Sequence, residues 1–360
     1  MKKVLVYISS EWMFDPDKDI IGYLTPMYDI HWFYFANEKS LRVPKNTIEE
    51  YAKTYNVRLH WLSNHLRQLS PKRFLYMIRL ALFIKKLKPY KIIKVEQDLY
   101  WSLASKLILR VPKIYFIHDV LMHSGTHNRR IRQLFSYLTF RMNHNFLFFS
   151  NSQASIFKQM YKNKNVYATH MSVKDFGKPT LGRPSINKGI KLLFFGRIEY
   201  NKGLDSLITS LEQISNNGIS NITLSICGKG SYWPTCQKML KSNKLYNLQV
   251  RFIKNEEIPN LFNSHHFLVL PYRDATQSGP IMIAANYGLP IVASNLKSFH
   301  EIYPQNCAIY YSELSKCLTK LSKMTQEDYN ILVSNCQLLK NAFSAPLLAK
   351  GISEFISKAK

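Results

Sequence analysis

Four small polar residues, Thr276-Gln277-Ser278-Gly279, stand between the apolar run Phe267–Leu270 and Pro280. The run has the length of a buried strand, and Ser followed by Gly and Pro is typical of a helix start. We therefore predict a helix over 280–287 that ends at Gly288. Its N-terminus would present free N–H groups and the positive end of the helix dipole, which suits a phosphate. A capped core helix that holds no ligand is the alternative.

A second candidate is the pair His118-Asp119, which directly follows the apolar run Lys113–Ile117. Residues at the carboxyl end of a strand line the ligand crevice of an open α/β sheet, so we expect His118 to lie in a site. A histidine held by hydrogen bonds in the core is the alternative. A metal site on His118 and His123 is not predicted, because the sequence suggests no further ligands.

Basic and glycine-rich turns follow two further strand-like runs. Gly196-Arg197 comes directly after the run at 192–195, and Lys202-Gly203 opens a helix with apolar residues at 204, 207, 208 and 211. The run at 222–226 ends in Gly228-Lys229-Gly230, which is similar to a dinucleotide-binding turn but is more often a tight βα turn.

The elements that would position these residues alternate between strands and helices along the whole chain. This rhythm predicts an α/β fold with parallel sheets, as 360 residues with 46% hydrophobic content suffice for two cores. We predict a first domain over 1–173, a linker over 174–188 rich in Gly and Pro turns, a second domain over 189–342 and a final helix over 343–360. Within the first domain, we expect residues 9–20 to form a polar loop and residues 47–66 a helix.

The net charge of +26 is unevenly spread, since residues 1–180 hold 29 Lys/Arg against 12 Asp/Glu. A balance this positive favours anionic partners, namely nucleic acid, phosphorylated small molecules or an anionic membrane surface. Five cysteines without a CxxC pair argue against disulfides and zinc, and the apolar run after the N-terminus is too short for a signal peptide. These features favour a cytoplasmic protein.

The segment 73–88 is the most amphiphilic part of the chain. Its apolar stretch is interrupted by Arg79 and is far shorter than the ~20 residues of a membrane span. It would either lie on an anionic leaflet, with its apolar side in the headgroup region, or pack in the core with snorkelling lysines at its end.

Several of these motifs, taken together, resemble the GT-B fold glycosyltransferases, in particular glycosyltransferase family 4 (glycosyl transferases group 1). They are Phe195-Gly196-Arg197, Lys202-Gly203-Leu204, Cys227-Gly228-Lys229-Gly230, Leu270-Pro271 and the stretch GLPIVAS at 288–294, with His118-Asp119 in the first half. The resemblance implies two Rossmann-like domains that face each other across a cleft, with the C-terminal helix packed back on the first domain. A nucleotide-sugar donor would bind the second domain and an acceptor the first.

The resemblance also implies roles for individual residues. Arg197 and Lys202 would hold the donor's diphosphate and neutralise the charge that grows on the leaving group, so that they stabilise the transition state more than the bound donor. His118, with Asp119 beside it, would lie at the sugar and acceptor hydroxyls. The expected catalytic residues are therefore His118, Asp119, Arg197 and Lys202, and the expected donor-binding residues are Gly196, Arg197, Lys202, Gly228, Arg273, Thr276, Gln277, Ser278 and Gly279.

The chain departs from the family pattern at two places. Two glutamates, common in the family before the GLP turn, are replaced by Ala275 and Ile283. The glycine-rich turn usual after the first strand is replaced by Ser9-Ser10-Glu11-Trp12. These departures leave the identity of the donor and the geometry of the acceptor site open.

The sequence as a whole favours a transferase that moves a sugar, of the hexose class, from a nucleotide diphosphate sugar to a carbohydrate or lipid-linked acceptor in cell-surface polysaccharide synthesis. The resemblance implies retention of configuration, without a metal or other cofactor, at the cytoplasmic membrane face. One alternative is a degenerate GT-B protein that binds a nucleotide or a partner without turnover. A nucleic-acid-binding protein is a third hypothesis, but it rests on charge alone and no nucleic-acid-binding motif supports it.

Overall fold

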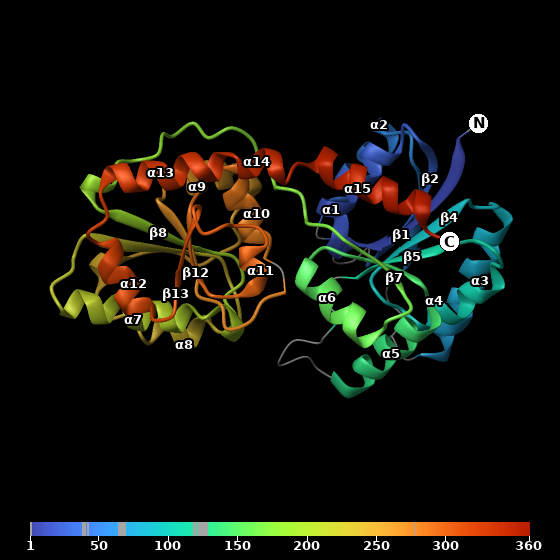
Figure 1. Cartoon of the computed structure of the whole chain (residues 1–360), viewed down its shortest axis with the longest axis horizontal. Coiled ribbons are helices and arrows are strands. Elements are labelled where there is room, and N and C mark those ends of the chain that lie inside the picture. The colour runs from blue at the N-terminus through green and yellow to red at the C-terminus, as the bar shows by residue number, and fades with distance from the viewer. Residues whose placement is uncertain are drawn as a thin grey trace. The chain divides into compact units, whose positions relative to one another are not determined.

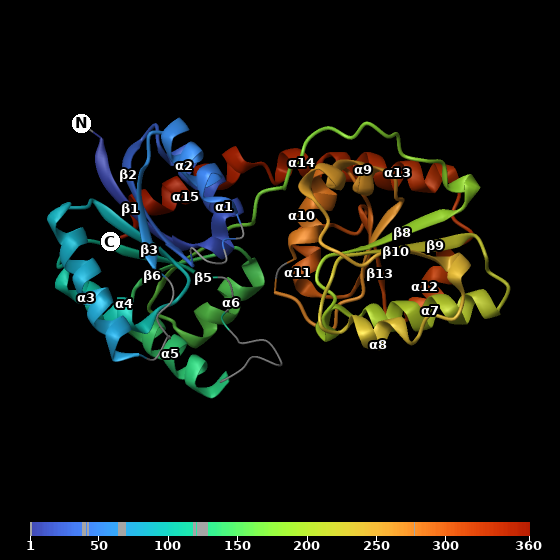
Figure 2. The same ribbon diagram turned by 180° about the vertical axis from the view of Figure 1, so that it is seen from behind.

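The computed structural model describes residues 2–37, 41, 43–63, 70–117, 120, 129–276 and 278–360. The chain divides into two compact units, here called unit 1 (Met1–Ser172 with Ala345–Lys360) and unit 2 (Val173–Ser344). Each unit contains one parallel sheet with helices on both faces, as Figure 1 and Figure 2 show. The structure thus confirms the predicted α/β fold class.

The seven-stranded sheet of unit 1 has the order β3-β2-β1-β4-β5-β6-β7. Strand β1 lies between β2 and β4 and is buried on both faces: Leu5 and Tyr7 face one hydrophobic core, Val6 and Ile8 the other. Continuous apolar runs are expected of parallel strands covered on both sides. The strands are β1 (Lys3–Ser10), β2 (Tyr28–Ala36), β3 (Arg58–Ser63), β4 (Lys91–Val95), β5 (Lys113–Ile117), β6 (Asn145–Phe148) and β7 (Asn165–Ala168).

Two layers of helices cover this sheet. Helices α1 (Phe14–Leu24), α2 (Lys45–Thr54) and α15 (Ala345–Lys358) pack on the core of Leu5 and Tyr7. Helices α3 (Pro71–Lys86), α4 (Leu99–Ala104), α5 (Arg129–Met142) and α6 (Asn151–Met160) pack on the opposite core, with the short 3-10 turn η2 (Ser105–Leu107) after α4. Another 3-10 turn, η1 (Glu11–Met13), precedes α1.

Two expectations for unit 1 were wrong. The segment expected to be a polar loop after β1 contains α1, whose apolar residues at 14, 20, 21 and 24 are buried. The helix expected over 47–66 ends at Thr54, because the chain turns at Asn56 with a φ of 53° and continues as β3, which pairs with β2.

Helix α3 packs one side of the segment 73–88 into the core, and its other side is exposed. Its residues Met77, Leu80, Ala81 and Ile84 are buried in unit 1. Within the described ranges, no helix has the length and apolar character needed to cross a bilayer.

The C-terminal helix packs back on the first unit, as the resemblance implies. Helix α15 contacts α1, and its last carbonyls are bound by a buried lysine from β4. The Lys91 ammonium donates to the carbonyl oxygens of Ile356, of Ser357 at 3.2 Å and of Ala359 at 2.8 Å. A cation at a helix C-terminus is favoured by the helix dipole and supplies the missing donors.

The six-stranded sheet of unit 2 has the order β10-β9-β8-β11-β12-β13. Its strands are β8 (Ile190–Phe195), β9 (Ile222–Cys227), β10 (Tyr246–Gln249), β11 (Phe267–Leu270), β12 (Ile291–Ser294) and β13 (Ala308–Tyr311). Its helices are α7 (Leu204–Asn216), α8 (Trp233–Gln237), α9 (Ile258–Asn263), α10 (Gly279–Asn286), α11 (Lys297–His300), α12 (Leu314–Leu321), α13 (Gln326–Gln337) and α14 (Leu339–Ala342). Four 3-10 turns complete it: η3 (Ile186–Lys188), η4 (Tyr200–Lys202), η5 (Asn243–Leu245) and η6 (Asn255–Glu257).

Candidate functional site

The predicted donor residues of unit 2 lie where the strand order reverses, between β8 and β11. In an open parallel sheet this switch point forms the ligand crevice at the carboxyl ends of the strands. The loop after β8 carries Gly196, Arg197 and Lys202, and the loop after β11 leads to α10. Segments about 75 residues apart in the sequence are thus neighbours at one edge of the sheet.

Close backbone contacts hold the two loops together. The backbone N–H of Arg273 donates to the carbonyl of Asn201 at 2.9 Å. Gly203 has a φ of 64°, and a Cβ at this position would lie 1.9 Å from the carbonyl oxygen of Pro271. Only glycine allows this approach without a shift of the backbone.

The glycine-rich turn after β9 supports the same region from the neighbouring strand. The N–H of Gly196 donates to the carbonyl of Cys227 at 2.9 Å. Gly228 has a φ of 141°, and a Cβ there would lie 1.8 Å from the carbonyl oxygen of Gly196. The geometry gives Gly228 a packing role, while contact between Gly228 and a donor stays a prediction.

Lys202 is a cation held without a carboxylate partner among the described residues. Its ammonium lies 3.8 Å from the centre of the Tyr272 ring, in a cation–π contact. Burial and, to a lesser extent, the positive charge of Arg197 lower the pKa of Lys202 to about 8, while Asp274 partly opposes the shift. A half-buried cation beside a second cation is poised to bind an anion.

Tyr272 connects Lys202 to the start of α10. The Ser278 hydroxyl donates to the Tyr272 hydroxyl at 3.4 Å. Burial raises the pKa of Tyr272 to about 12, against the opposing effects of the Ser278 hydrogen bond and the charge of Arg197. The structure thus brings together Arg197, Lys202 and Ser278, three predicted residues, around a tyrosine that sequence reasoning missed.

The N-terminus of α10 is open beside these side chains. Ser278 occupies the N-cap position, but its side chain does not accept a hydrogen bond from the first turn. Among the described residues, a Cβ on Gly279 would meet no atom within 4 Å. A Cβ on Gly196 would lie 3.5 Å from Pro280 Cγ, which places the loop of Arg197 next to the helix start. These features can accommodate an anion at the helix end.

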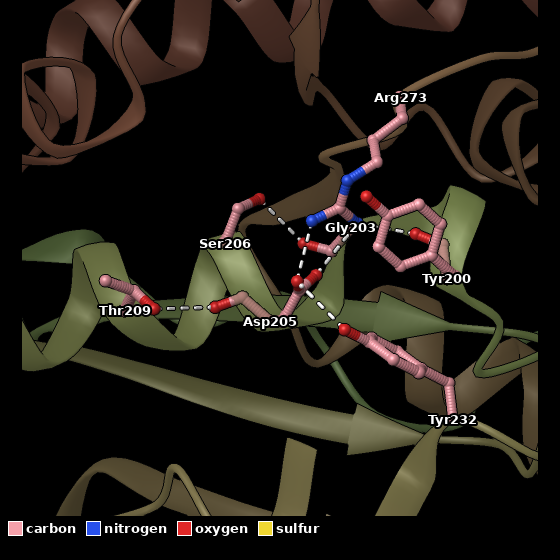
Figure 3. Close-up of polar contacts among 7 residues, drawn as sticks. All are labelled: Tyr200, Gly203, Asp205, Ser206, Thr209, Tyr232 and Arg273. Atoms are coloured by element: carbon pink, nitrogen blue, oxygen red, sulfur yellow. Dashed lines mark hydrogen bonds and ion pairs between the residues drawn. The ribbon is translucent and has the colours of Figure 1, made fainter. Parts of the chain in front are cut away.

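Arg273 lies differently from the other predicted donor residues (Figure 3). Its guanidinium donates to both carboxylate oxygens of Asp205, at 2.9 and 2.6 Å, and to the carbonyl of Tyr200 at 2.5 Å. It also lies 4.1 Å from the centre of the Tyr200 ring. A bidentate pair of this kind satisfies the charge of Arg273 internally and fixes the turn that carries Lys202.

Asp205 is the centre of this network. Burial alone would raise the pKa of its carboxyl, but the hydrogen bonds and charge of Arg273, the N–H of Ser206 and the Tyr232 hydroxyl together lower it. The Tyr232 hydroxyl lies 3.3 Å from the carboxylate, as Figure 3 shows. The pair with Arg273 could not be predicted from the sequence, because its partners lie 68 residues apart.

The remaining predicted residues are placed as follows. Thr276 lies in the loop before α10, where the carbonyl of Ala275 accepts a hydrogen bond from Ser298 at 2.8 Å. Ile283, at the second of the two glutamate positions, is buried in α10 with 5% of its surface exposed. His118, Asp119 and Gln277 lie outside the described residues.

Unit 1 has its own switch point, between β1 and β4, with a cluster of ionisable groups that sequence reasoning missed. Asp17 is fully buried and accepts a hydrogen bond from Tyr7 at 2.7 Å, and burial raises its pKa to about 8. Lys94 is also buried, and burial lowers its pKa. Next to it, Glu96 has a φ of 67°, an uncommon conformation for a residue with a side chain, and accepts from Ser10 at 3.4 Å.

Metal ligation finds no support in the described ranges, where no group of three or more His, Cys, Asp or Glu side chains is arranged to hold an ion.

Comparisons with known proteins bear on both units. Residues 189–318 match the family described as glycosyl transferases group 1. A relative from Klebsiella pneumoniae, an uncharacterized 41.2 kDa protein in the cps region, is 29% identical over 113 residues. That match covers 31% of this chain and 30% of the relative, so it spans less than a third of the relative's length.

Solved structures match the chain over nearly its whole length. A glycosyltransferase from Rickettsia africae has a TM-score of 0.74 at 12% identity, covering 99% of this chain and 98% of its own. A sucrose-phosphate synthase from Thermosynechococcus elongatus (TM-score 0.73, 11% identity) and a lipopolysaccharide outer core galactosyltransferase (TM-score 0.71, 14% identity) each cover 99% of both chains. Identities this low show a shared fold. Residues 189–318 thus form a domain of the glycosyl transferases group 1 type, and the chain as a whole shares the GT-B fold of these solved structures.

Proposed function

We propose that this protein transfers a hexose from a nucleotide diphosphate sugar to a carbohydrate or lipid-linked acceptor, with retention of configuration, in the synthesis of a cell-surface polysaccharide. The observation that carries the proposal is the convergence of Lys202, Arg197 and the open N-terminus of α10 at the switch point of unit 2. The relative from a cps region supports the polysaccharide context. The reaction takes place at the cytoplasmic face of the membrane, where a lipid-linked acceptor would be presented.

The chemistry follows from the charges at this site. As the bond between the sugar C1 and the phosphate oxygen breaks, negative charge grows on the leaving nucleoside diphosphate. Lys202, Arg197 and the N–H groups of α10 stabilise this charge, which is larger in the transition state than in the bound donor. In this proposal Gly196, Gly228, Thr276, Ser278 and Gly279 shape the donor pocket, and Arg273 acts on it by fixing the turn of Lys202.

The acceptor binds unit 1 in this proposal. Strand β5 ends at Ile117, directly before His118 in the sequence, and the cluster around Asp17 and Glu96 lies at the carboxyl edge of the same sheet. We assign to His118, with Asp119, contacts with the sugar and the acceptor hydroxyls, on the basis of the family resemblance.

A second function is favoured by Ile283. The two glutamates common in the family are absent here, and Ile283 is part of the interior. A protein that binds a nucleotide sugar without turnover would tolerate this loss. Binding and turnover therefore have to be measured separately.

The test begins with a panel of UDP-, GDP- and dTDP-sugars in a thermal unfolding assay. A donor at about 100 times its Kd stabilises the native state by about 2.7 kcal/mol, which raises the Tm by roughly 5–10 °C. Release of nucleoside diphosphate with an acceptor extract then separates the transferase from the binding protein. Absence of a response to every nucleotide would refute both.

Matched variants connect the assay to the site. Lys202→Met and Arg197→Ala are expected to remove both stabilisation and turnover. Lys191→Met is the control, because Lys191 is exposed at the opposite end of β8. A loss of binding in the control equal to that in Lys202→Met would count against the assignment.

A further inference from the structure

The two helix layers of unit 1 differ strongly in charge. Helices α3, α4 and α5 with the turn η2 carry ten Lys or Arg, five in α3, one in η2 and four in α5, and no Asp or Glu. The opposite layer, α1, α2 and α15, carries five Lys and six Asp or Glu. Exposure to solvent does not by itself require acidic and basic residues to be separated in this way, because both layers face outward from one sheet.

The acid-free layer, here called the basic layer (α3, α4, η2 and α5), also exposes large apolar side chains. Eight of them are between 41% and 58% exposed in the described part of the chain. They are Leu75, Leu82 and Phe83 on α3, Leu103 and Leu107 on α4 and η2, and Ile131, Leu134 and Tyr137 on α5. Single exposed apolar residues are common, but a group of this size on neighbouring helices indicates an interaction surface.

These helices form a continuous surface. The rings of Phe74 on α3 and Tyr100 on α4 have centroids 5.5 Å apart, and those of Tyr100 and Phe135 on α5 lie 6.1 Å apart. Figure 1 and Figure 2 show the three helices side by side on one face of the sheet. Each helix buries its inner side in the same core and exposes other side chains outside it; Phe83 also packs edge-on against the rings of Phe33 and His60, with centroids 6.0 and 5.8 Å away.

The nearby carboxylate does not neutralise this surface. Asp98 precedes α4, caps its first turn through the N–H of Trp101 and pairs with Arg73 at 2.8 Å. Both side chains of this pair are nearly covered, at 13% and 12% exposure, so the carboxylate of Asp98 pairs with Arg73 inside the layer.

We propose that the basic layer docks unit 1 on an anionic lipid bilayer, with Leu75, Leu82 and Phe83 inserted among the headgroups and the lysines around them bound to lipid phosphates. Charge complementarity selects an anionic partner, and the interspersed leucines select a surface with an apolar interior. A nucleic acid would match the charge but would leave these apolar side chains in water. The inference extends the proposed membrane location to a defined surface, but its test needs neither donor nor acceptor.

The test is a sedimentation assay with vesicles of phosphatidylcholine alone or with 30% phosphatidylglycerol. The full-length protein is expected to bind the anionic vesicles and to be released by salt, because exposed charges are screened. Each lysine near the surface contributes about fivefold in partitioning, so the double variant Lys85→Gln/Lys86→Gln should bind roughly 30-fold more weakly. The matched control is Lys350→Gln/Lys358→Gln on α15, in the opposite layer.

The apolar contribution is tested in the same way. Leu75→Asn combined with Leu82→Asn should lower binding by about tenfold or more. Leu347→Asn is the control, because Leu347 is 50% exposed on α15. All these side chains are on the surface, and an unchanged Tm verifies that each variant folds.

Insertion is detected independently in the otherwise unchanged protein by a Phe83→Trp probe, whose fluorescence brominated lipids should quench. Three results would overturn the proposal. The first is an absence of binding to anionic vesicles, and the second is an equal loss of binding in the α15 controls. The third is binding that gives no quenching and that a soluble polyanion such as heparin abolishes completely.

Discussion

Raising the pH from 7 to 9 is expected to weaken the binding of a nucleoside diphosphate about tenfold, because Lys202 loses its proton in this range. Burial and the charge of Arg197 lower the pKa of Lys202 to about 8 in the free protein. About nine tenths of the free molecules then carry the charge at pH 7, and about one tenth at pH 9. The phosphate groups stay ionised throughout, since their last pKa lies near 6.

The bound anion reverses the shift of Lys202. A diphosphate beside the ammonium favours its charged form and raises its pKa, so binding near pH 8 should take up about half a proton. In the protein without ligand, raising the pH has the opposite effect: it increases the folding stability. The pKa of Lys202 is lower in the folded than in the unfolded protein, whose lysines have a pKa near 10.4, so its contribution to stability rises between pH 8 and about 10.

Isothermal titration calorimetry at pH 7, 8 and 9, in two buffers of different ionisation enthalpy, measures the affinity and the proton uptake together. Lys202→Arg is the matched control, because an arginine keeps its charge and should give a flat profile between pH 7 and 9. A flat profile in the wild type, or a tenfold decrease that persists in Lys202→Arg, would refute the assigned role of this side chain.

Three further predictions concern positioning and stability. Arg273→Ala releases the turn that carries Lys202. It should therefore raise the KM for the donor and lower the free energy of unfolding by about 1 kcal/mol. Arg273→Lys should recover little of either effect, because a lysine cannot make the bidentate pair. Lys91→Met should destabilise unit 1 by about 2–3 kcal/mol in urea unfolding, because it leaves the last carbonyls of α15 without donors; an effect below 0.5 kcal/mol would contradict this. Burial lowers the pKa of both His31 and His60, whose Nδ1 and Nε2 atoms lie 3.1 Å apart beside an arginine. Unfolding should therefore become easier as the pH falls below about 6.5, and His60→Gln should reduce this dependence.

The sequence predicted the strands of both sheets best where they are continuous apolar runs. Such runs are unambiguous because a parallel strand is covered on both faces. It failed at β3, whose sequence at 58–63 carries polar and charged residues and lies at the edge of the sheet, half-exposed. It also failed at α1, where Asp17 looks like a loop residue but is buried against Tyr7. In both cases tertiary contacts decide the structure that local pattern leaves open.

The candidate site shows the same division. That Lys202 and Ser278 lie close together could be predicted, because the carboxyl ends of adjacent parallel strands meet at one edge of a sheet. The side chain between them, Tyr272, and the pairing of Arg273 with Asp205 could not, because they depend on rotamers and distances that no spacing in the sequence encodes.

The functions proposed for the cations of this protein follow from whether the fold supplies a counter-charge to each of them. Arg273 and Arg73 resemble binding residues in the sequence, yet each faces a carboxylate at 2.6–2.8 Å, and their charges are used within the fold. Lys202 has no such partner in the described part of the chain, and the basic layer contains no acid at all. An uncompensated charge that is partly buried costs free energy until an anion arrives, which suits a small ligand in a pocket. An exposed charge without a counter-charge costs little free energy in water. Several such charges together attract an extended anionic surface. The same net positive charge can therefore serve two kinds of partner, and burial decides which cation serves which.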